Sequence, residues 1–254
     1  MKEEVVIVTG GSNGMGKYMA KEFASRGAKV VITGRTAEKL EAAKQEIEQE
    51  EGQVLTVVMD VRKPEDVERM LKEAVDAFGK VTSLVNNAAG NFIVPAEKLS
   101  VNGWNSVIDI VLNGTFYCSH TLGNYWIDKK IRGKIINMVA TYAWDAGPGV
   151  IHSASAKAGV LAMTRTLAVE WGRKYGIRVN AIAPGPIDRT GGAEKLWESE
   201  EAAKRTLASI PLGRLGEPEE IGKLAAFILS EDAAYMNGEV ITLDGGQQLN
   251  QFPF

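Results

Sequence analysis

Three glycines, at positions 10, 14 and 16, follow an apolar run close to the start of the chain. The run reads VVIVT, the turn after it reads GGSNGMG, and the next residues, KYMAKEFASRG, have the helical spacing of apolar side chains. Glycine lets a backbone approach a bound group closely, and the amides and dipole at a helix N-terminus attract negative charge. The pattern therefore predicts a strand, a turn and a helix that together bind a pyrophosphate. The candidate residues are Thr9, Gly10, Ser12, Asn13, Gly14, Met15 and Gly16.

The end of the second apolar run, KVVIT, bears on which dinucleotide binds. An acidic residue there would accept a hydrogen bond from a ribose 2′-hydroxyl, whereas an arginine accommodates a 2′-phosphate. The sequence continues GRTAEKL, with no acid at the end of the run and with Arg35 just beyond it. Arginine offers a planar fork of donors to phosphate oxygens, and Thr36 beside it is expected to cap the following helix. We therefore expect NADPH rather than NADH.

A second group of polar residues lies in the middle of the chain, at Asn113, Tyr142, Ser153 and Lys157. Tyr142 follows the apolar run KIINMVA, so it should emerge at the carboxyl end of a strand, where open α/β sheets bind their ligands. Ser153 and Lys157 stand one helical turn apart in HSASAKAG. The alternative is structural: Tyr142 is then a packed aromatic residue, and Ser153 is the N-cap of the helix that follows.

The elements that must position these residues alternate along the chain. Short, nearly continuous apolar runs suit strands buried on both faces, and amphipathic stretches between them suit helices that end at glycine. Pro64 stands where the first turn of a helix tolerates proline. The alternation predicts one doubly wound α/β domain over residues 1–254 with a parallel sheet of about seven strands. The expected strands are 5–9, 29–33, 54–59, 83–87, 134–140, 177–183 and 239–243, and the clearest helices are 37–52 and 63–79.

Composition limits the class of protein further. The 254 residues carry a net charge of −3 and no basic run, so we expect no nucleic-acid partner. No apolar run approaches the ~20 residues of a membrane span, and the N-terminus does not resemble a targeting peptide, so we expect a soluble, cytoplasmic protein. The one cysteine, Cys118, is expected in the core. The irregular segment 184–213 is expected to act as a lid over the site.

The glycine spacing, together with NNAAG at 86–90 and LDGG at 243–246, resembles the short-chain dehydrogenase/reductase family over nearly the whole chain. The resemblance implies that Asn87, Ala88, Ala89 and Gly90 line the cofactor cleft and that Asp60 and Val61 contact the adenine. In this family a Tyr-x-x-x-Lys pair acts with a serine and an asparagine. The tyrosine transfers a proton, and the lysine binds the nicotinamide ribose and eases ionisation of the phenol, whose ordinary pKa is ~10.

Two of the four usual residues are absent. Ser153 stands where the family has its tyrosine, and Ala140 stands where it has its serine, while Asn113 and Lys157 are present. The combination of Asn113, Tyr142, Ser153 and Lys157 resembles the mitochondrial-type 2,4-dienoyl-CoA reductases of the family, whose acidic tyrosine has this displaced position. PGPI, which comprises Pro184, Gly185, Pro186 and Ile187, and NNAAGNF, which ends at Phe92, resemble the same enzymes and are expected at the cofactor and the substrate, respectively.

The displacement has a physical reason. In a ketone the hydride acceptor and the oxygen are about 1.2 Å apart, whereas in a 2,4-dienoyl thioester the hydride adds at C5 and charge develops on an oxygen on the order of 5 Å farther along. A tyrosine placed for the ketone would miss that oxygen, and Tyr142 with Asn113 would form an oxyanion-hole-like pair for the dienolate. The implied reaction is NADPH-dependent reduction of 2,4-dienoyl-CoA to 3-enoyl-CoA in unsaturated fatty-acid breakdown.

Two other functions remain open at this point. One is another enoyl or carbonyl reductase, although Val150 occupies the position, seven residues before Lys157, where enoyl-acyl-carrier-protein reductases place their tyrosine. The other is a catalytically silent NADPH-binding protein. We expect no metal site, a loop position for His152 and a core position for His120. Lys195, Arg189 and Arg205 are candidates for the phosphates of CoA, and the resemblance implies a homotetramer.

Overall fold

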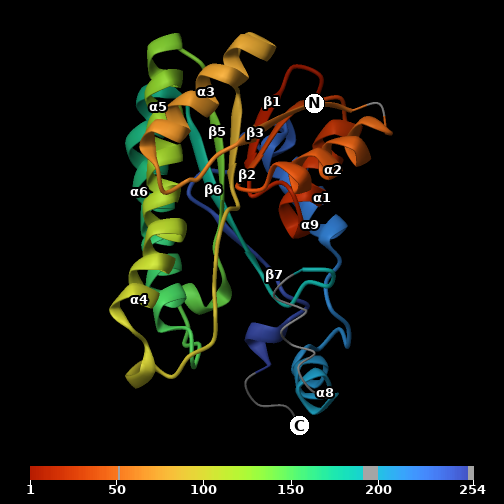
Figure 1. Ribbon diagram of the computed structural model, residues 1–254, viewed down its shortest axis with the longest axis vertical. Coiled ribbons are helices and arrows are strands. Elements are labelled where there is room, and N and C mark those ends of the chain that lie inside the picture. The colour runs from red at the N-terminus through yellow and green to blue at the C-terminus, as the bar shows by residue number, and fades with distance from the viewer. Residues whose placement is uncertain (51, 191–199, 251–254) are drawn as a thin grey trace.

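Seven parallel strands form one sheet in the part of the chain that the structure describes (Figure 1). The computed structural model describes residues 1–50, 52–190 and 200–250. The strand order is β3-β2-β1-β4-β5-β6-β7, so the direction of winding reverses between β1 and β4, as in a doubly wound fold. The predicted fold class is therefore confirmed. The strands are β1 (Val5–Thr9), β2 (Lys29–Gly34), β3 (Gln53–Val58), β4 (Ser83–Asn86), β5 (Lys134–Met138), β6 (Arg178–Pro184) and β7 (Val240–Leu243).

Helices cover both faces of this sheet. Figure 1 shows α1, α2 and α9 on one side and α3, α5 and α6 on the other. The α-helices are α1 (Gly14–Ser25), α2 (Ala37–Glu48), α3 (Pro64–Phe78), α4 (Val101–Ile108), α5 (Gly114–Lys129), α6 (Ile151–Tyr175), α8 (Glu200–Ser209) and α9 (Pro218–Leu229). A π-helical turn, η2 (Asp109–Asn113), joins α4 to α5, and the 3₁₀ turns are η1 (Ala96–Lys98), η3 (Thr141–Ala143), η4 (Glu231–Ala233) and η5 (Gln247–Leu249).

The continuous apolar character of the strands follows from burial on both faces. Successive side chains of a strand point to opposite faces, so Val6 and Val8 of β1 pack in the cluster that holds α1, α2 and α9. Val5 and Ile7 pack in a second cluster with residues of α3 and α5. The four aliphatic side chains of β1 therefore lie in hydrophobic cores on the two faces of the sheet, and no polar alternation is needed.

Several element ends differ from the sequence-based expectation. The helix expected over 37–52 ends at Glu48 rather than at glycine, whereas α3 begins at Pro64 and ends before Gly79 in the left-handed conformation (φ 81°), as predicted. The strand expected over 134–140 ends at Met138 because η3 turns the chain there, although the amide of Val139 still donates to Ile182 of β6.

Cys118 lies in the core, as predicted. Its side chain is fully buried, and desolvation raises the pKa of the thiol to about 12. A thiol with this pKa stays protonated near neutral pH, so Cys118 serves packing rather than nucleophilic chemistry. Within the described ranges, no helix combines the length and apolarity that crossing a membrane requires.

Candidate active site

The glycine turn after β1 has the conformation that its sequence predicts. Gly10 (φ 65°) and Gly14 (φ 49°) adopt left-handed backbone conformations, which suit a residue without a β-carbon. A β-carbon on Gly16 would lie 2.4 Å from the carbonyl oxygen of Gly10. The first turn of α1, which contains Met15, is therefore packed directly on the glycine turn, and Ser12 and Asn13 complete that turn before the helix. This close packing leaves backbone amides at a helix N-terminus open to an anion, which fits the pyrophosphate of a dinucleotide.

Hydrogen bonds fix the loop after β4 against the glycine turn. The Thr9 hydroxyl accepts from the amides of Asn87 and Ala88, each at 3.0 Å. The Asn87 side chain donates to the carbonyl oxygens of Thr9 (3.0 Å) and Gly10 (3.1 Å). The structure thus brings the predicted residues of both segments to the place where the strand order reverses, with Ala89 and Gly90 following in the same loop.

Arg35 lies exposed just after β2. Among the ion pairs of the described residues, none includes Arg35, so its guanidinium is available to a phosphate. Thr36 occupies the N-cap position of α2, but its side chain makes no capping hydrogen bond. The expected capping role of Thr36 is therefore not seen, and the position of Arg35 carries the NADPH prediction by itself.

Asp60 and Val61 follow β3 beside this position. The Asp60 carboxylate accepts from the Arg62 guanidinium, with Nε 2.9 Å from Oδ1, and this hydrogen bond lowers the pKa of Asp60. Val61 is buried, and a β-carbon on Gly114 would come within 2.7 Å of its side chain. Asp60 is thus held as a carboxylate just after β3, while Val61 packs against the start of α5.

Tyr142 and Ser153 meet across the carboxyl end of β5. Tyr142 lies in η3, and its hydroxyl oxygen is 3.1 Å from the hydroxyl oxygen of Ser153. Ser153 is buried within the first turn of α6, whose N-cap is Val150. Ser153 therefore does not cap the helix, and the alternative reading of this serine is wrong. Its hydrogen bond with Tyr142 brings the usual tyrosine position and the displaced tyrosine together.

Lys157 lies one turn farther along α6. Only 7% of its surface is exposed, and its ammonium donates to the carbonyl oxygen of Met138 at 2.5 Å. Burial lowers the pKa of Lys157 to about 8. The lysine is therefore a desolvated cation at the end of β5, close in sequence and space to the Tyr142–Ser153 pair.

Asn113 is the last residue of the π-helical turn η2. Its side-chain amide donates to the Asp109 carboxylate at 2.9 Å. π-Helical turns inside helices are rare and occur frequently at functional sites. Asp109 was not among the residues predicted from the sequence, although residues four apart in a helix are neighbours on its surface, so the spacing from Asn113 indicates such a pair.

The two histidines differ from expectation. His152 is completely buried in α6 rather than in a loop, and neither ring nitrogen has a hydrogen-bond partner. Its ring meets that of Phe92 edge to face, with centroids 4.4 Å apart, so Phe92 lies beside the start of α6. His120 is exposed rather than in the core and stacks on Phe116, because it lies on the outer face of α5. Within the described residues no His, Cys, Asp and Glu side chains form a group suited to a metal ion.

The PGPI segment continues from the end of β6. Pro184 closes β6, and a β-carbon on Gly185 would lie 2.6 Å from the side chain of Asp244. Pro186 directly precedes Ile187, which is buried and forms an isolated β-bridge with Gly216. The segment is therefore fixed at the carboxyl edge of the sheet, the edge that carries Tyr142.

Of the three candidate residues for binding CoA, the structure describes two. Arg189 donates to Glu219 and to the Tyr18 hydroxyl, each from Nη1 at 2.9 Å, so its guanidinium is already engaged. Arg205 is exposed on α8. Lys195 lies outside the described residues, as does part of the predicted lid 184–213.

Comparison with known proteins agrees with this geometry. Residues 10–248 match the family model described as Enoyl-(Acyl carrier protein) reductase. The chain is 64% identical over its full length to a Bacillus subtilis (strain 168) protein named a probable 2,4-dienoyl-CoA reductase, (2E)-enoyl-CoA-producing, and covers 100% of that protein. It is 43% identical to the Caenorhabditis elegans protein named probable 2,4-dienoyl-CoA reductase 3, (3E)-enoyl-CoA-producing, over 98% of this chain and 81% of that one.

A solved structure supports the same assignment. The crystal structure of a short chain dehydrogenase from Bacillus anthracis str. 'Ames Ancestor' shares 68% sequence identity with this chain, covers 99% of both chains and superposes with a TM-score of 0.92. The sheet order, the glycine turn and these similarities agree over nearly the whole length. The chain belongs to the short-chain dehydrogenase/reductase family.

Proposed function

We propose that the protein is an NADPH-dependent reductase of 2,4-dienoyl-CoA thioesters that acts in unsaturated fatty-acid breakdown. The observation that carries the proposal is the Tyr142–Ser153 contact, in which the two hydroxyl oxygens are 3.1 Å apart. Ser153 occupies the usual tyrosine position, four residues before Lys157, and Tyr142 reaches it from the end of β5. The names of the Bacillus subtilis and Caenorhabditis elegans relatives support the same substrate class.

The cofactor is proposed to lie across the carboxyl ends of β1 and β4. Its pyrophosphate would meet the glycine turn, and its 2′-phosphate would meet Arg35, whose guanidinium is exposed. When bound, NADPH supplies the hydride that is added at C5 of the dienoyl chain. Lys157 would hold the nicotinamide ribose.

The chain's own residues stabilise the charge that develops on the thioester oxygen. Tyr142 would donate its hydroxyl proton towards this oxygen, and the Asn113 side chain would offer a second donor. Ser153 orients the Tyr142 hydroxyl through their hydrogen bond. The Lys157 charge lowers the cost of the tyrosinate that forms when Tyr142 gives up its proton. Phe92 would line the substrate side of the cleft.

The position of the remaining double bond depends on where the dienolate is protonated. Protonation at C2 gives a 3-enoyl product, and protonation at C4 gives a 2-enoyl product. C2 is bonded to the carbon that bears the oxygen at Tyr142, whereas C4 is two bonds farther along the chain. We therefore propose the 3-enoyl product. The name of the Bacillus subtilis relative gives the (2E)-enoyl product, so identification of the product by NMR decides between them.

The description of the matching family model favours a second candidate, the reduction of 2-enoyl thioesters. In that reaction the hydride acceptor is C3, which is two carbons closer to the oxygen than C5. The displaced position of Tyr142 suits the longer distance, which favours the dienoyl substrate.

The test is single-turnover oxidation of NADPH with 2,4-hexadienoyl-CoA, beside 2-hexenoyl-CoA and a 3-ketoacyl-CoA. The wild type should reduce the dienoyl substrate fastest. Tyr142→Phe should lower that rate ~10²–10³-fold, the usual cost of losing one oxyanion donor, while NADPH affinity is unchanged. Ser153→Ala should cost less, because Ser153 orients the donor. Equal rates for wild type and Tyr142→Phe would refute the role of Tyr142.

A further inference from the structure

A cavity of about 670 Å³ lies at the end of the fold opposite the candidate active site. Its wall is formed by the C-terminal ends of α5 and α6, the first residues of β5 and β6, and the segment after α9. Tyr142 and Lys157 lie at the carboxyl ends of the parallel strands. The amino ends, which line the cavity, lie at the opposite edge of the sheet. Lys157 and Arg173 are separated by 16 residues of α6, or about 24 Å of helix at ~1.5 Å per residue. The cavity is therefore separate from the site already described.

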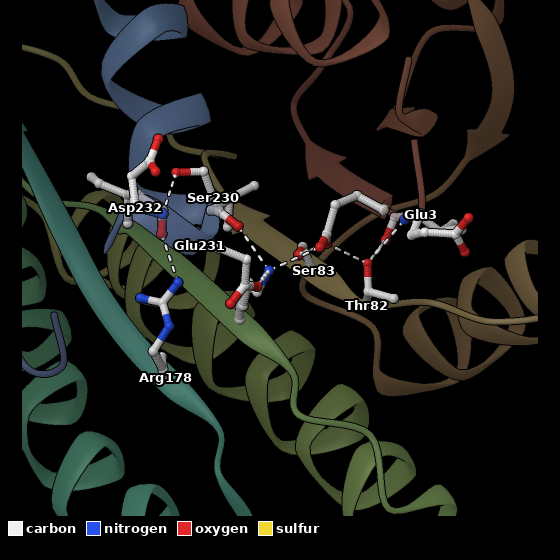
Figure 2. Close-up of polar contacts among 12 residues, drawn as sticks. Glu3, Thr82, Ser83, Arg178, Ser230, Glu231 and Asp232 are labelled. Atoms are coloured by element: carbon white, nitrogen blue, oxygen red, sulfur yellow. Dashed lines mark hydrogen bonds and ion pairs between the residues drawn. The ribbon is translucent and has the colours of Figure 1, made fainter. Parts of the chain in front are cut away.

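The inner part of the cavity is balanced in charge. The Lys134 ammonium contacts the carboxylates of Glu4 (2.8 Å) and Glu231 (3.2 Å). Arg178 donates to the carbonyl oxygens of Ile228 (2.8 Å) and Met236 (2.9 Å). Figure 2 shows Arg178 directed from its strand towards the segment that carries Glu231. These bonds hold two cations in fixed positions at the floor of the cavity.

The outer part of the cavity has an excess of positive charge. Lys130, Arg132, Arg173 and Lys174 line it. None of the ion pairs found among the described residues includes any of these four cations. Lys174 instead lies over the Tyr175 ring, 5.0 Å from its centroid. Four cations without carboxylate partners thus surround one cavity in a chain whose net charge is −3.

Helix ends explain only part of this arrangement. Cations near the C-terminus of a helix gain about 0.3–1 kcal/mol each from its dipole, which accounts for Lys130 at the C-cap of α5 and for Arg173 and Lys174 in the last turn of α6. Arg132 lies beyond α5, and its side chain extends over Gly176, where a β-carbon would approach it to 3.1 Å. Like charges gathered in a cleft repel one another. They also raise the local concentration of ions of opposite charge, so a bound anion would relieve this repulsion.

We propose that this basic cavity binds a small molecule that carries a chain of phosphates. Arg132 and Arg173 offer planar forks of donors that match phosphate oxygens, and Lys130 and Lys174 add point charges. A volume of about 670 Å³ is within the usual range of small-molecule sites, ~300–1,000 Å³. The exposed Tyr235 ring in the same wall provides a flat surface for a nucleotide base.

The test is calorimetric titration of inorganic tripolyphosphate into the full-length protein that has first been saturated with NADP⁺. Saturation keeps the glycine turn from contributing. The wild type should bind tripolyphosphate, and the double variant R132Q/R173Q should bind it about 100-fold more weakly, because each lost charge-assisted contact costs about tenfold or more. A parallel titration with ATP shows whether a nucleotide base adds to the binding of the phosphate chain. Tighter binding of ATP would assign the base to the Tyr235 ring, and equal binding would leave the phosphate chain as the recognised part.

The matched control is K44Q/K72Q, which removes the same charge from the exposed faces of α2 and α3 and should leave binding unchanged. Lys130→Gly is a second test if the double variant does not fold, since residue 130 has a left-handed φ of 55° that glycine adopts without strain. It should weaken binding about tenfold. Absence of binding to the wild type, or equal binding by R132Q/R173Q, would overturn the proposal.

Discussion

Burial of Lys157 should make the stability of the protein depend on pH in an unusual direction. The pKa of this lysine falls from 10.5 to about 8 because the folded protein removes its ammonium from water. Between these two pH values the unfolded state binds more protons than the folded state, so the free energy of unfolding rises with pH. Below pH 8 the lysine is charged in both states, and the folded state bears the whole cost of the buried charge.

The size of this effect follows from the pKa. A fall from 10.5 to about 8 corresponds to about 3 kcal/mol of destabilisation at neutral pH, at ~1.4 kcal/mol per pH unit. Lys157→Met removes the charge and keeps most of the side-chain volume. Its stability relative to the wild type should therefore be greater at pH 7 than at pH 9.5, by about 2 kcal/mol. Loss of the hydrogen bond to Met138 changes the stability of Lys157→Met by a similar amount at both pH values, so it does not alter this difference.

Urea unfolding of the cofactor-free protein between pH 7 and pH 9.5, at one protein concentration, measures this difference. The other titrating groups are the same in both proteins, so their contributions to the pH dependence of stability cancel in the difference. Lys72→Met is the matched control, because a hydrogen bond to Asp76 raises the pKa of Lys72 and keeps it protonated in both states across this range. Its stability difference from the wild type should be constant. A constant difference for Lys157→Met as well would refute the reasoning.

Three further changes test other parts of the site. Arg35→Ala should weaken NADPH binding by about 1.5–3 kcal/mol and NADH binding far less, as measured by fluorescence titration; an equal loss for both cofactors would contradict a phosphate contact. Gly16→Ala should reduce cofactor affinity and destabilise the fold by about 1–3 kcal/mol, because its new methyl group would meet the Gly10 carbonyl oxygen at 2.4 Å; unchanged thermal unfolding would show that the turn can relax. His152→Leu should melt at the same or a higher temperature, since it removes two buried nitrogens without partners; a lower melting temperature would reveal a partner for the ring.

The sequence was sufficient for the parts of the structure that depend on local patterns. Apolar runs identified all the described strands to within two residues at each end, because a strand buried on both faces needs nearly continuous apolar residues. The glycine turn could be predicted since its function depends on backbone conformation, which glycine at positions 10 and 14 reveals directly. Tyr142 could be placed at the end of a strand because it follows one of these apolar runs.

Features that depend on packing between distant segments could not be predicted. His152 was expected in a loop, directly before Ser153 as the candidate N-cap, whereas α6 begins at Ile151 and its N-cap is Val150. His120 was expected in the core because its neighbours in sequence are apolar, yet it lies on the outer face of α5. The basic cavity combines residues 126–134, 172–178 and 231–237, and no single stretch of sequence shows them together.

The π-helical turn at Asp109–Asn113 has a consequence for how the chain tolerates length changes. Such a turn amounts to one extra residue in an otherwise α-helical stretch. Deleting one residue there would restore regular helix, which turns by about 100° per residue. α4 would then rotate by that angle relative to α5, and Asn113 would lose its register with Asp109.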